Sequence, residues 1–249
     1  MKKALSLLLC FVFFSIASAQ VKLSEKVAAP FISINAGAQL PAGNIQKYFG
    51  PNFSLGLDVL YKTKKNILFG AYGHFIFGGS VKYDSLLRGI ATQEGFILNQ
   101  NGQYGTVRLY ERGMNLGLRT GMIFPILGSN PNSGIMITAG IGLLQYKIRI
   151  ETLLDDIPQL STAYKKGYDR LTNGLNLNEF IGYFNLDNRK RLNYYFGFEL
   201  NQAFTKNRRD YNFDTESKDD RLHYDFLNGF RIGFIIPFYA KVPNDYYYN

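Results

Sequence analysis

Cysteine, tryptophan and histidine are scarce or missing in this chain. Its single cysteine, Cys10, lies in the first twenty residues, and there is no tryptophan. If that leader is removed on export, no thiol remains, which excludes a disulfide framework and a cysteine metal site. Only His74 and His223 are left to supply imidazole chemistry.

Long apolar runs are also lacking after the leader. No later stretch reaches about eighteen uninterrupted apolar residues, so the sequence predicts no transmembrane helix. A phosphate-cradling glycine loop, a nucleophile elbow and a metal-spaced set of His and Cys are missing too. We therefore expect no cofactor, no metal and no enzymatic activity.

The leader itself has the pattern of a secretory signal peptide. Lys2 and Lys3 precede a short apolar run, Ala4–Ile16, and the small residues Ala17–Ala19 follow. A basic start, a short apolar core and an A-x-A site are typical of a cleaved export signal. We expect residues 1–19 to be removed and residues 20–249 to form one domain with a short tail from Tyr239.

The stretch Leu222–Phe238 shows what kind of domain this is. Its even positions are apolar apart from Asn228, while its odd positions include the charged and small residues His223, Asp225, Gly229, Arg231 and Gly233. A period of two places all the large apolar groups on one face of an extended chain. A membrane-spanning strand needs roughly 9 to 11 residues in lipid, and this segment is long enough to extend beyond both surfaces.

Eight segments alternate in this way. They cover residues 31–40, 52–61, 67–77, 106–124, 134–151, 174–184, 192–204 and 222–238. The connections alternate between long or medium and short, as in a closed antiparallel up-and-down β-barrel whose long loops are external. Asn101-Gly102 predicts a β-hairpin in the long loop 78–103. If that hairpin joined the wall, the barrel would have ten strands instead of eight.

Two of the segments are irregular. In 134–151 the pattern predicts a change of parity at Leu143-Leu144, so that Tyr146, Ile148 and Ile150 face outward and Lys147 and Arg149 inward, as a β-bulge would produce. In 174–184 the alternation is blurred around Glu179–Ile181.

The inward faces are polar and of mixed charge. The predicted interior network comprises Asp58, Glu111, Arg119, Lys147, Arg149, Glu199, Asp225 and Arg231. Folding adjacent segments onto each other sets Glu111 near Lys147 and Glu199 near Arg231, and we expect both as ion pairs. Buried charges are tolerated when paired, and an eight-stranded barrel is just wide enough for side chains to fill it. A conducting lumen remains the alternative.

These features together resemble the small outer-membrane β-barrel family of Gram-negative bacteria, similar to OmpX, to the OmpA transmembrane domain and to the porin or PorT-like group. The resemblance covers about Pro30 to Phe238 and rests on pattern, not on a sharp motif. It implies an integral outer-membrane location. With no tryptophan, Tyr and Phe alone must supply the interfacial aromatic girdles.

The expected role is structural, accessory or surface-interacting, through the external loops. The net charge of +9 falls to about +7 without Lys2 and Lys3, and on an exported protein this favours anionic lipid and lipopolysaccharide over nucleic acid. The basic residues expected to contact lipopolysaccharide are Lys165, Lys166, Arg170, Lys206, Arg208, Arg209 and Arg221. Other envelope proteins of a secretion or assembly complex are further candidate partners.

Two alternatives stay open. One is a narrow porin-like solute channel. The other is a barrel enzyme acting on lipid or peptide at the rim, for which His223 is the best candidate because Asp225 lies two residues away on the same face.

Overall fold

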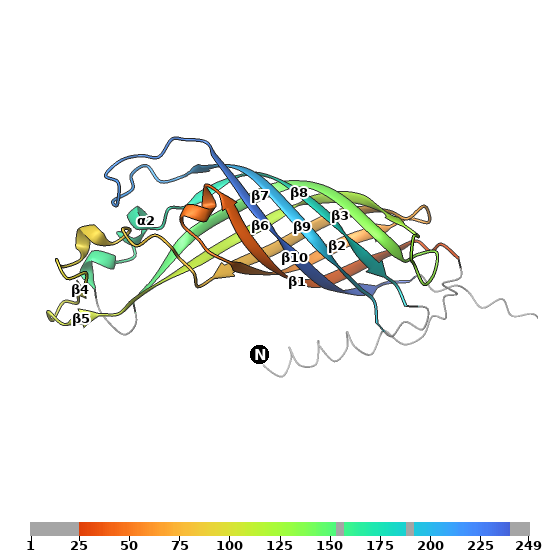
Figure 1. Ribbon diagram of the computed structural model, residues 1–249, viewed down its shortest axis with the longest axis horizontal. Helices are drawn as coiled ribbons and strands as arrows, with labels where there is room; N and C mark the ends of the chain where they lie inside the picture. The colour runs from red at the N-terminus through yellow and green to blue at the C-terminus, as the bar shows by residue number, and fades with distance from the viewer. Residues whose placement is uncertain (1–24, 153–156, 188–191, 240–249) are drawn as a thin grey trace, which may run out of the picture.

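A computed structural model describes residues 25–152, 157–187 and 192–239 of the chain (Figure 1). The predicted signal peptide and the tail from residue 240 lie outside these ranges. None of the described helices is long and apolar enough to cross a membrane.

Eight strands close into a ring, which confirms the predicted barrel. The strands are β1 (Ala29–Gly43), β2 (Asn52–Lys62), β3 (Ile67–Gly78), β6 (Val107–Phe124), β7 (Gly134–Thr152), β8 (Thr172–Asn185), β9 (Tyr194–Asn207) and β10 (His223–Pro237). Each is antiparallel to the strand before it, and β1 closes the ring against β10 from Phe31↔Pro237 to Gly43↔Asp225. No edge is left open in a closed ring, so all its ladder groups find partners in the wall.

The connections differ in length at the two ends of the ring (Figure 1). The short turns after β2, β6 and β8 lie at one end, called here the short-turn end. The opposite, long-loop end carries the connections after β1, β3, β7 and β9. Their short elements are η1 (Ile45–Lys47), η2 (Arg88–Ile90), η3 (Pro158–Leu160), α2 (Lys165–Tyr168) and the strands β4 (Ile97–Leu98) and β5 (Tyr104–Gly105).

The hairpin predicted at Asn101-Gly102 is present, and it stays out of the wall. Strands β4 and β5 pair only with each other, and Gly102 takes a positive φ of 73° in the turn. The alternative of ten wall strands is therefore wrong.

Strand β1 extends past the predicted break at Pro41. The β1–β2 ladder ends at Gln39↔Asn52, whereas the β1–β10 ladder continues through Pro41↔Leu227. Proline is tolerated where one side of a strand is unpaired. In β8 the alternation is unbroken, with Glu179 outward and Phe180 buried.

The predicted parity change in β7 is wrong. Its ladder with β6 runs without interruption from Phe124↔Ile135 to Val107↔Thr152, so no bulge occurs. Tyr146 and Ile148 are buried, and Lys147 and Arg149 are exposed. The reason is that this part of β7 lies beyond the apolar wall, where its inner face packs on loop residues and its outer face is polar.

The interior is filled by an apolar layer at each end with polar side chains between them. The layer at the short-turn end consists of Phe31, Leu60, Leu68, Ile123, Met136, Phe180, Phe184, Leu186, Tyr195 and Ile235. The layer at the long-loop end joins wall residues to loop residues and includes Ile45, Phe49, Ile76, Leu86, Leu144, Tyr146, Ile148, Ile157, Leu160 and Leu227. Both mouths of the barrel are thus closed by packed side chains.

Candidate functional site

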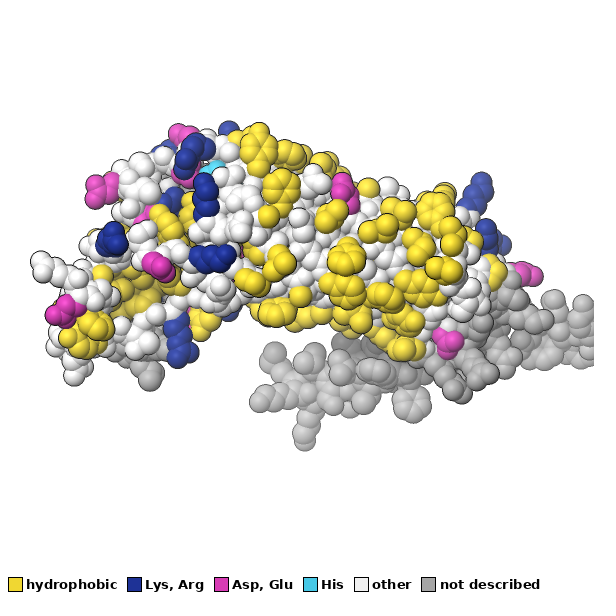
Figure 2. Space-filling view, viewed as in Figure 1, with side chains coloured by type: hydrophobic (Ala, Val, Ile, Leu, Met, Phe, Trp, Pro, Cys, Tyr) yellow, Lys and Arg dark blue, Asp and Glu magenta, His cyan; other side chains and the backbone are white. Residues whose placement is uncertain are grey.

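The outside of the wall is apolar over most of its height (Figure 2). Exposed side chains on it include Ile34, Leu55, Leu57, Phe75, Leu116, Leu118, Ile141, Leu143, Phe198 and Ile232. Polar residues line the inside, the reverse of the arrangement in a water-soluble protein, and the exterior matches the apolar band of a membrane barrel. This is the fold of a small outer-membrane β-barrel.

Aromatic residues gather at both margins of the apolar band. Ring pairs near the short-turn end are Tyr61–Phe69 at 5.3 Å and Tyr183–Phe196 at 6.0 Å, and near the long-loop end Phe53–Phe77 at 6.3 Å and Phe204–Tyr224 at 5.7 Å. Tyrosine and phenylalanine thus occupy the positions of interfacial girdles in a chain without tryptophan.

Glu199 lies at the centre of the interior network. Its carboxylate accepts hydrogen bonds from the guanidinium of Arg231 and from Asn178 at 3.0 Å, and it lies 3.4 Å from Arg119. All of these side chains are buried. Two cations around one carboxylate satisfy its charge without water.

Arg119 joins Glu199 to a second carboxylate, Asp58. Asp58 lies 3.5 Å from Arg119 and 3.0 Å from Nε2 of His74, and it accepts a hydrogen bond of 2.9 Å from Tyr195. The guanidinium also stacks on Tyr72, 4.4 Å from the ring centroid. The network therefore crosses the lumen and connects strands that are not neighbours in the wall.

The other two interior acids, Glu111 and Asp225, are hydrogen-bonded and form no salt bridge among the described residues. Glu111 accepts bonds of 3.0 and 3.1 Å from the amide of Asn52. Asp225 accepts from Tyr146 at 2.8 Å and from Thr205 at 2.6 Å. The predicted Glu111–Lys147 ion pair is wrong.

Two predicted members of the network lie outside the barrel. Lys147 faces outward, and Arg149 pairs on the outer surface with Glu151 at 2.7 Å. Both placements follow from the continuous register of β7. If the alternation had been continued from Ile135 without a change of parity, Lys147 and Arg149 would have been predicted to face outward.

The histidine at the long-loop rim has a different partner from the one predicted. Nε2 of His223 lies 3.2 Å from Asp219, whereas Asp225 is held by Tyr146 and Thr205. Asp219 belongs to the loop before β10, and strand periodicity says nothing about loop residues. The predicted rim pair therefore does not form.

Arg170 ties all four long connections together. It binds Asp214 and lies 3.8 Å from Asp219, both in the β9–β10 loop. It also stacks near Tyr48 of the β1–β2 loop and Tyr83 of the β3–β6 loop, at 5.8 and 5.5 Å. Arg170 is buried and has a positive φ of 50°, so it is not free to contact lipopolysaccharide. We call this group the loop clamp.

Burial and neighbouring charges together set the protonation states in the loop clamp. Burial raises the pKa of the Tyr48 and Tyr83 hydroxyls, so both stay protonated, and that of Tyr83 donates to Asp214. Burial also opposes ionisation of Asp219, but the hydrogen bond from Arg221 and the charge of His223 outweigh it, and the pKa of Asp219 lies below its ordinary value.

Basic side chains on β6, β7 and β9 lie just beyond the apolar band at the long-loop end. Going towards the long-loop end, Arg112 is the next outward-facing residue beyond Met114 on β6, and Lys206 is the next one beyond Phe204 on β9. Arg112 and Lys147 are cross-strand partners. The basic collar, as we call it, consists of Arg112, Lys147, Arg149, Lys206 and Arg208.

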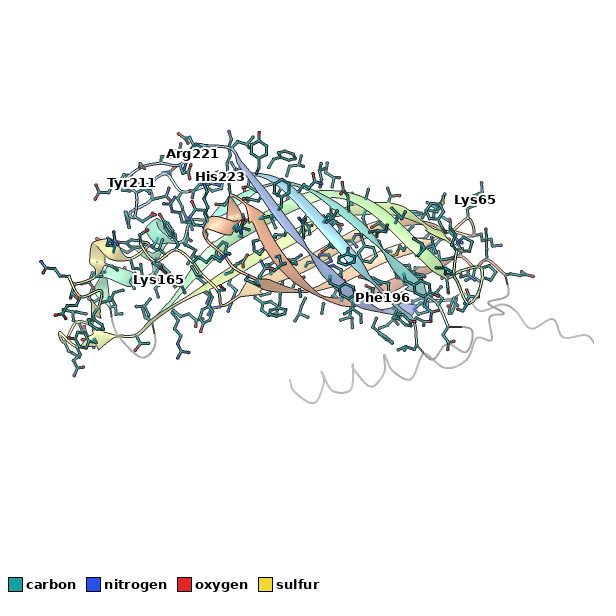
Figure 3. The ribbon with its side chains drawn as sticks, in the orientation of Figure 1. Lys65, Lys165, Phe196, Tyr211, Arg221 and His223 are labelled. Carbon is teal, nitrogen blue, oxygen red and sulfur yellow. The ribbon has the colours of Figure 1, made fainter. Side chains whose placement is uncertain are left out.

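The remaining predicted lipopolysaccharide contacts belong to the loops at the long-loop end, where Figure 3 labels Lys165 and Arg221. Lys166 and Arg221 are exposed, and Lys165 is half-buried. Arg209 is engaged by Asp169 at 2.5 and 2.7 Å. The sequence analysis did not include Arg112. It could have been found because it lies two residues from outward-facing Met114 and therefore on the same face of the strand.

Comparison with known proteins adds likeness in fold alone. No protein-family model matches the sequence, and no curated protein matches it. The Neisserial surface protein A (NspA) is 11% identical, over 85% of this chain and 99% of that one, with a TM-score of 0.45. Ail, the attachment invasion locus protein of Yersinia pestis, is 8% identical over 84% and 98%, with a TM-score of 0.37, in its complex with the heparin analogue sucrose octasulfate.

Proposed function

We propose that the protein is an integral outer-membrane protein that acts at the cell surface and binds the phosphates of lipopolysaccharide through its basic collar. The observation that carries this is the position of Arg112, Lys147 and Lys206 at the margin of the apolar band. At that height a membrane presents its charged headgroups, and Lys and Arg side chains pair with phosphate oxygens.

The basic collar and the loop clamp have different roles at the long-loop end. The loop clamp neutralises Arg170 and fixes the four loops, whereas the collar cations point away from the barrel. No chemical reaction is assigned to the chain in this proposal. Contact with other envelope proteins through the loops stays a prediction.

The test is binding of purified lipopolysaccharide to the folded protein in detergent. Each basic group near an anionic surface contributes about 1 kcal/mol. The triple variant Arg112→Gln/Lys147→Gln/Lys206→Gln should therefore bind about a hundredfold more weakly, with a smaller salt dependence. Dephosphorylated lipopolysaccharide should bind the unaltered protein as weakly as intact lipopolysaccharide binds the triple variant.

The matched control is Lys64→Gln/Lys65→Gln, which removes two exposed cations at the short-turn end. Lys65 lies at the opposite end of the barrel from Lys165 and Arg221 (Figure 3). This variant should bind normally. Equal loss in both variants would show a general charge effect and contradict the proposal.

A further inference from the structure

Polar side chains are not spread evenly over the outside of the wall. Within the apolar band, β1, β2 and β3 direct only apolar residues and glycine outward. Strands β8, β9 and β10 each direct one hydrogen-bonding side chain outward at mid-height, namely Glu179, Gln202 and Asn228. We call these three the outer polar cluster.

The ladder places the cluster on one small area. Glu179 is the cross-strand partner of Leu200, which is in turn the partner of Asn228. Gln202 lies one outward position from Leu200 on the same strand, and its amide is 3.5 Å from the Glu179 carboxylate. Exposed Leu175, Ile181, Phe198 and Phe230 surround the three.

Lipid tails leave this cluster unsatisfied. One long hydrogen bond from Gln202 uses little of the capacity of a carboxylate and two amides. The side-chain amide of Asn228 has no hydrogen-bond partner within the described part of the chain. A polar group facing hydrocarbon without a partner is unfavourable, and ionisable residues there usually mark a functional contact.

The wall beside the cluster is hollowed. Ala139, the cross-strand partner of Glu179 on β7, lines a shallow apolar groove with Phe69, Leu118, Thr120 and Ile141. A protein surface that meets Glu179 can therefore approach the backbone closely and pack side chains into the groove.

We infer that the β8–β10 sector of the wall binds a second copy of this chain within the membrane. The cluster is self-complementary, because Glu179 accepts hydrogen bonds and the amides of Gln202 and Asn228 donate them. Around a twofold axis the same patch on each copy satisfies the other. A partner of different chemistry would have to bring its own donors to that depth.

Disulfide cross-linking in lipid bilayers tests the inference. In a Cys10→Ser background, Leu200→Cys places a thiol inside the cluster, and Leu57→Cys places one on β2, outside the β8–β10 sector and three strands from β9 around the ring. Oxidation should link Leu200→Cys into a species of twice the chain mass and leave Leu57→Cys monomeric. Equal linking of both, or linking of Leu200→Cys to a different protein, overturns it.

A second measurement separates the contact from folding. Glu179→Leu and Gln202→Leu, followed by fluorescence energy transfer between labelled copies diluted in lipid, should each weaken self-association roughly tenfold. The barrel itself should keep its heat stability, since both positions face outward. Unchanged self-association in both variants overturns the inference. Lipopolysaccharide is absent from these assays, so they are independent of the basic collar.

Discussion

Inside the barrel, the guanidinium of Arg231 binds the carboxylate of Glu199 from a diagonal position on the neighbouring strand. Arg231 lies opposite Gly197 and Glu199 opposite Gly229. Gly37 on β1 lies beside the guanidinium, where a Cβ would be 3.6 Å from Nη2 of Arg231. The Glu199–Arg231 pair was expected from the sequence, and the structure adds Arg119 and Asn178 to it.

Glu199→Gln should destabilise the barrel strongly. The substitution leaves Arg231 and Arg119 buried beside a neutral amide, and breaking a buried pair in this way costs about 3 to 5 kcal/mol. The measurement is the temperature at which the protein in detergent loses the electrophoretic mobility of its folded form. Glu179→Gln, the same change on the outer face, should have little effect. Unchanged heat stability of Glu199→Gln would contradict the pairing.

Gly233→Ala should also lower stability. A Cβ at this position would lie 2.3 Å from the ring of Tyr195, which its hydrogen bond to Asp58 holds in place. Overpacking of this kind costs about 1 to 3 kcal/mol. Gly73→Ala is the control, because its Cβ would meet only the flexible end of Leu116 at 3.0 Å. Equal thermal stability of the two variants would show that the Tyr195 ring moves aside for the added Cβ, and would contradict the prediction.

The barrel should not conduct ions. Two apolar layers close the lumen at its ends, and the Asp58–Arg119–Glu199 network crosses it between them. Protein inserted into planar bilayers should give no discrete current steps, under conditions in which an open porin does. Reproducible ohmic steps would support the narrow-channel alternative instead.

Acid should loosen the loop clamp. The pKa of Asp219 is depressed in the folded protein, so its stabilising contribution is present above the unfolded carboxyl pKa of about 4 and is lost as the pH falls through the lower folded value. Spin labels at Thr162→Cys and Lys218→Cys, on two different loops, should give a narrow distance distribution at pH 7 that broadens as the pH falls below the unfolded carboxyl pKa of about 4.

The variant Asp219→Asn isolates this carboxylate from the others in the loops. In that background part of the broadening should already exist at pH 7, and the change on acidification should be smaller. If acid broadens the distribution equally in both proteins, Asp219 is not the group that responds.

The wall was predictable because lipid imposes a simple rule. Most outward side chains in the apolar band meet hydrocarbon, so a period of two appears in the sequence. It defines β2 and β10 to within one residue at each end. The interior position of Glu199, Arg231, Arg119 and Asp58 follows from the same alternation.

Loop contacts were not predictable in this way. Arg170 and Lys206 look alike in the sequence, as cations in or beside long loops. Only the folded chain brings Asp214 and Asp219 to Arg170 and leaves Lys206 exposed. Such contacts join residues far apart in sequence, and no local periodicity records them.

Strand β7 marks the boundary between the two. The sequence by itself determined that residues 134–151 are a strand and that Ile137 and Ile141 face outward. Only the tertiary structure decided where Tyr146, Ile148 and Lys147 point, because the surroundings of a strand change along its length. From Gly134 to Leu143 the outer face of β7 meets lipid. From Leu144 towards Thr152 its inner face meets Phe49 and Ile157. Apolar residues therefore belong on opposite faces of one unbroken strand.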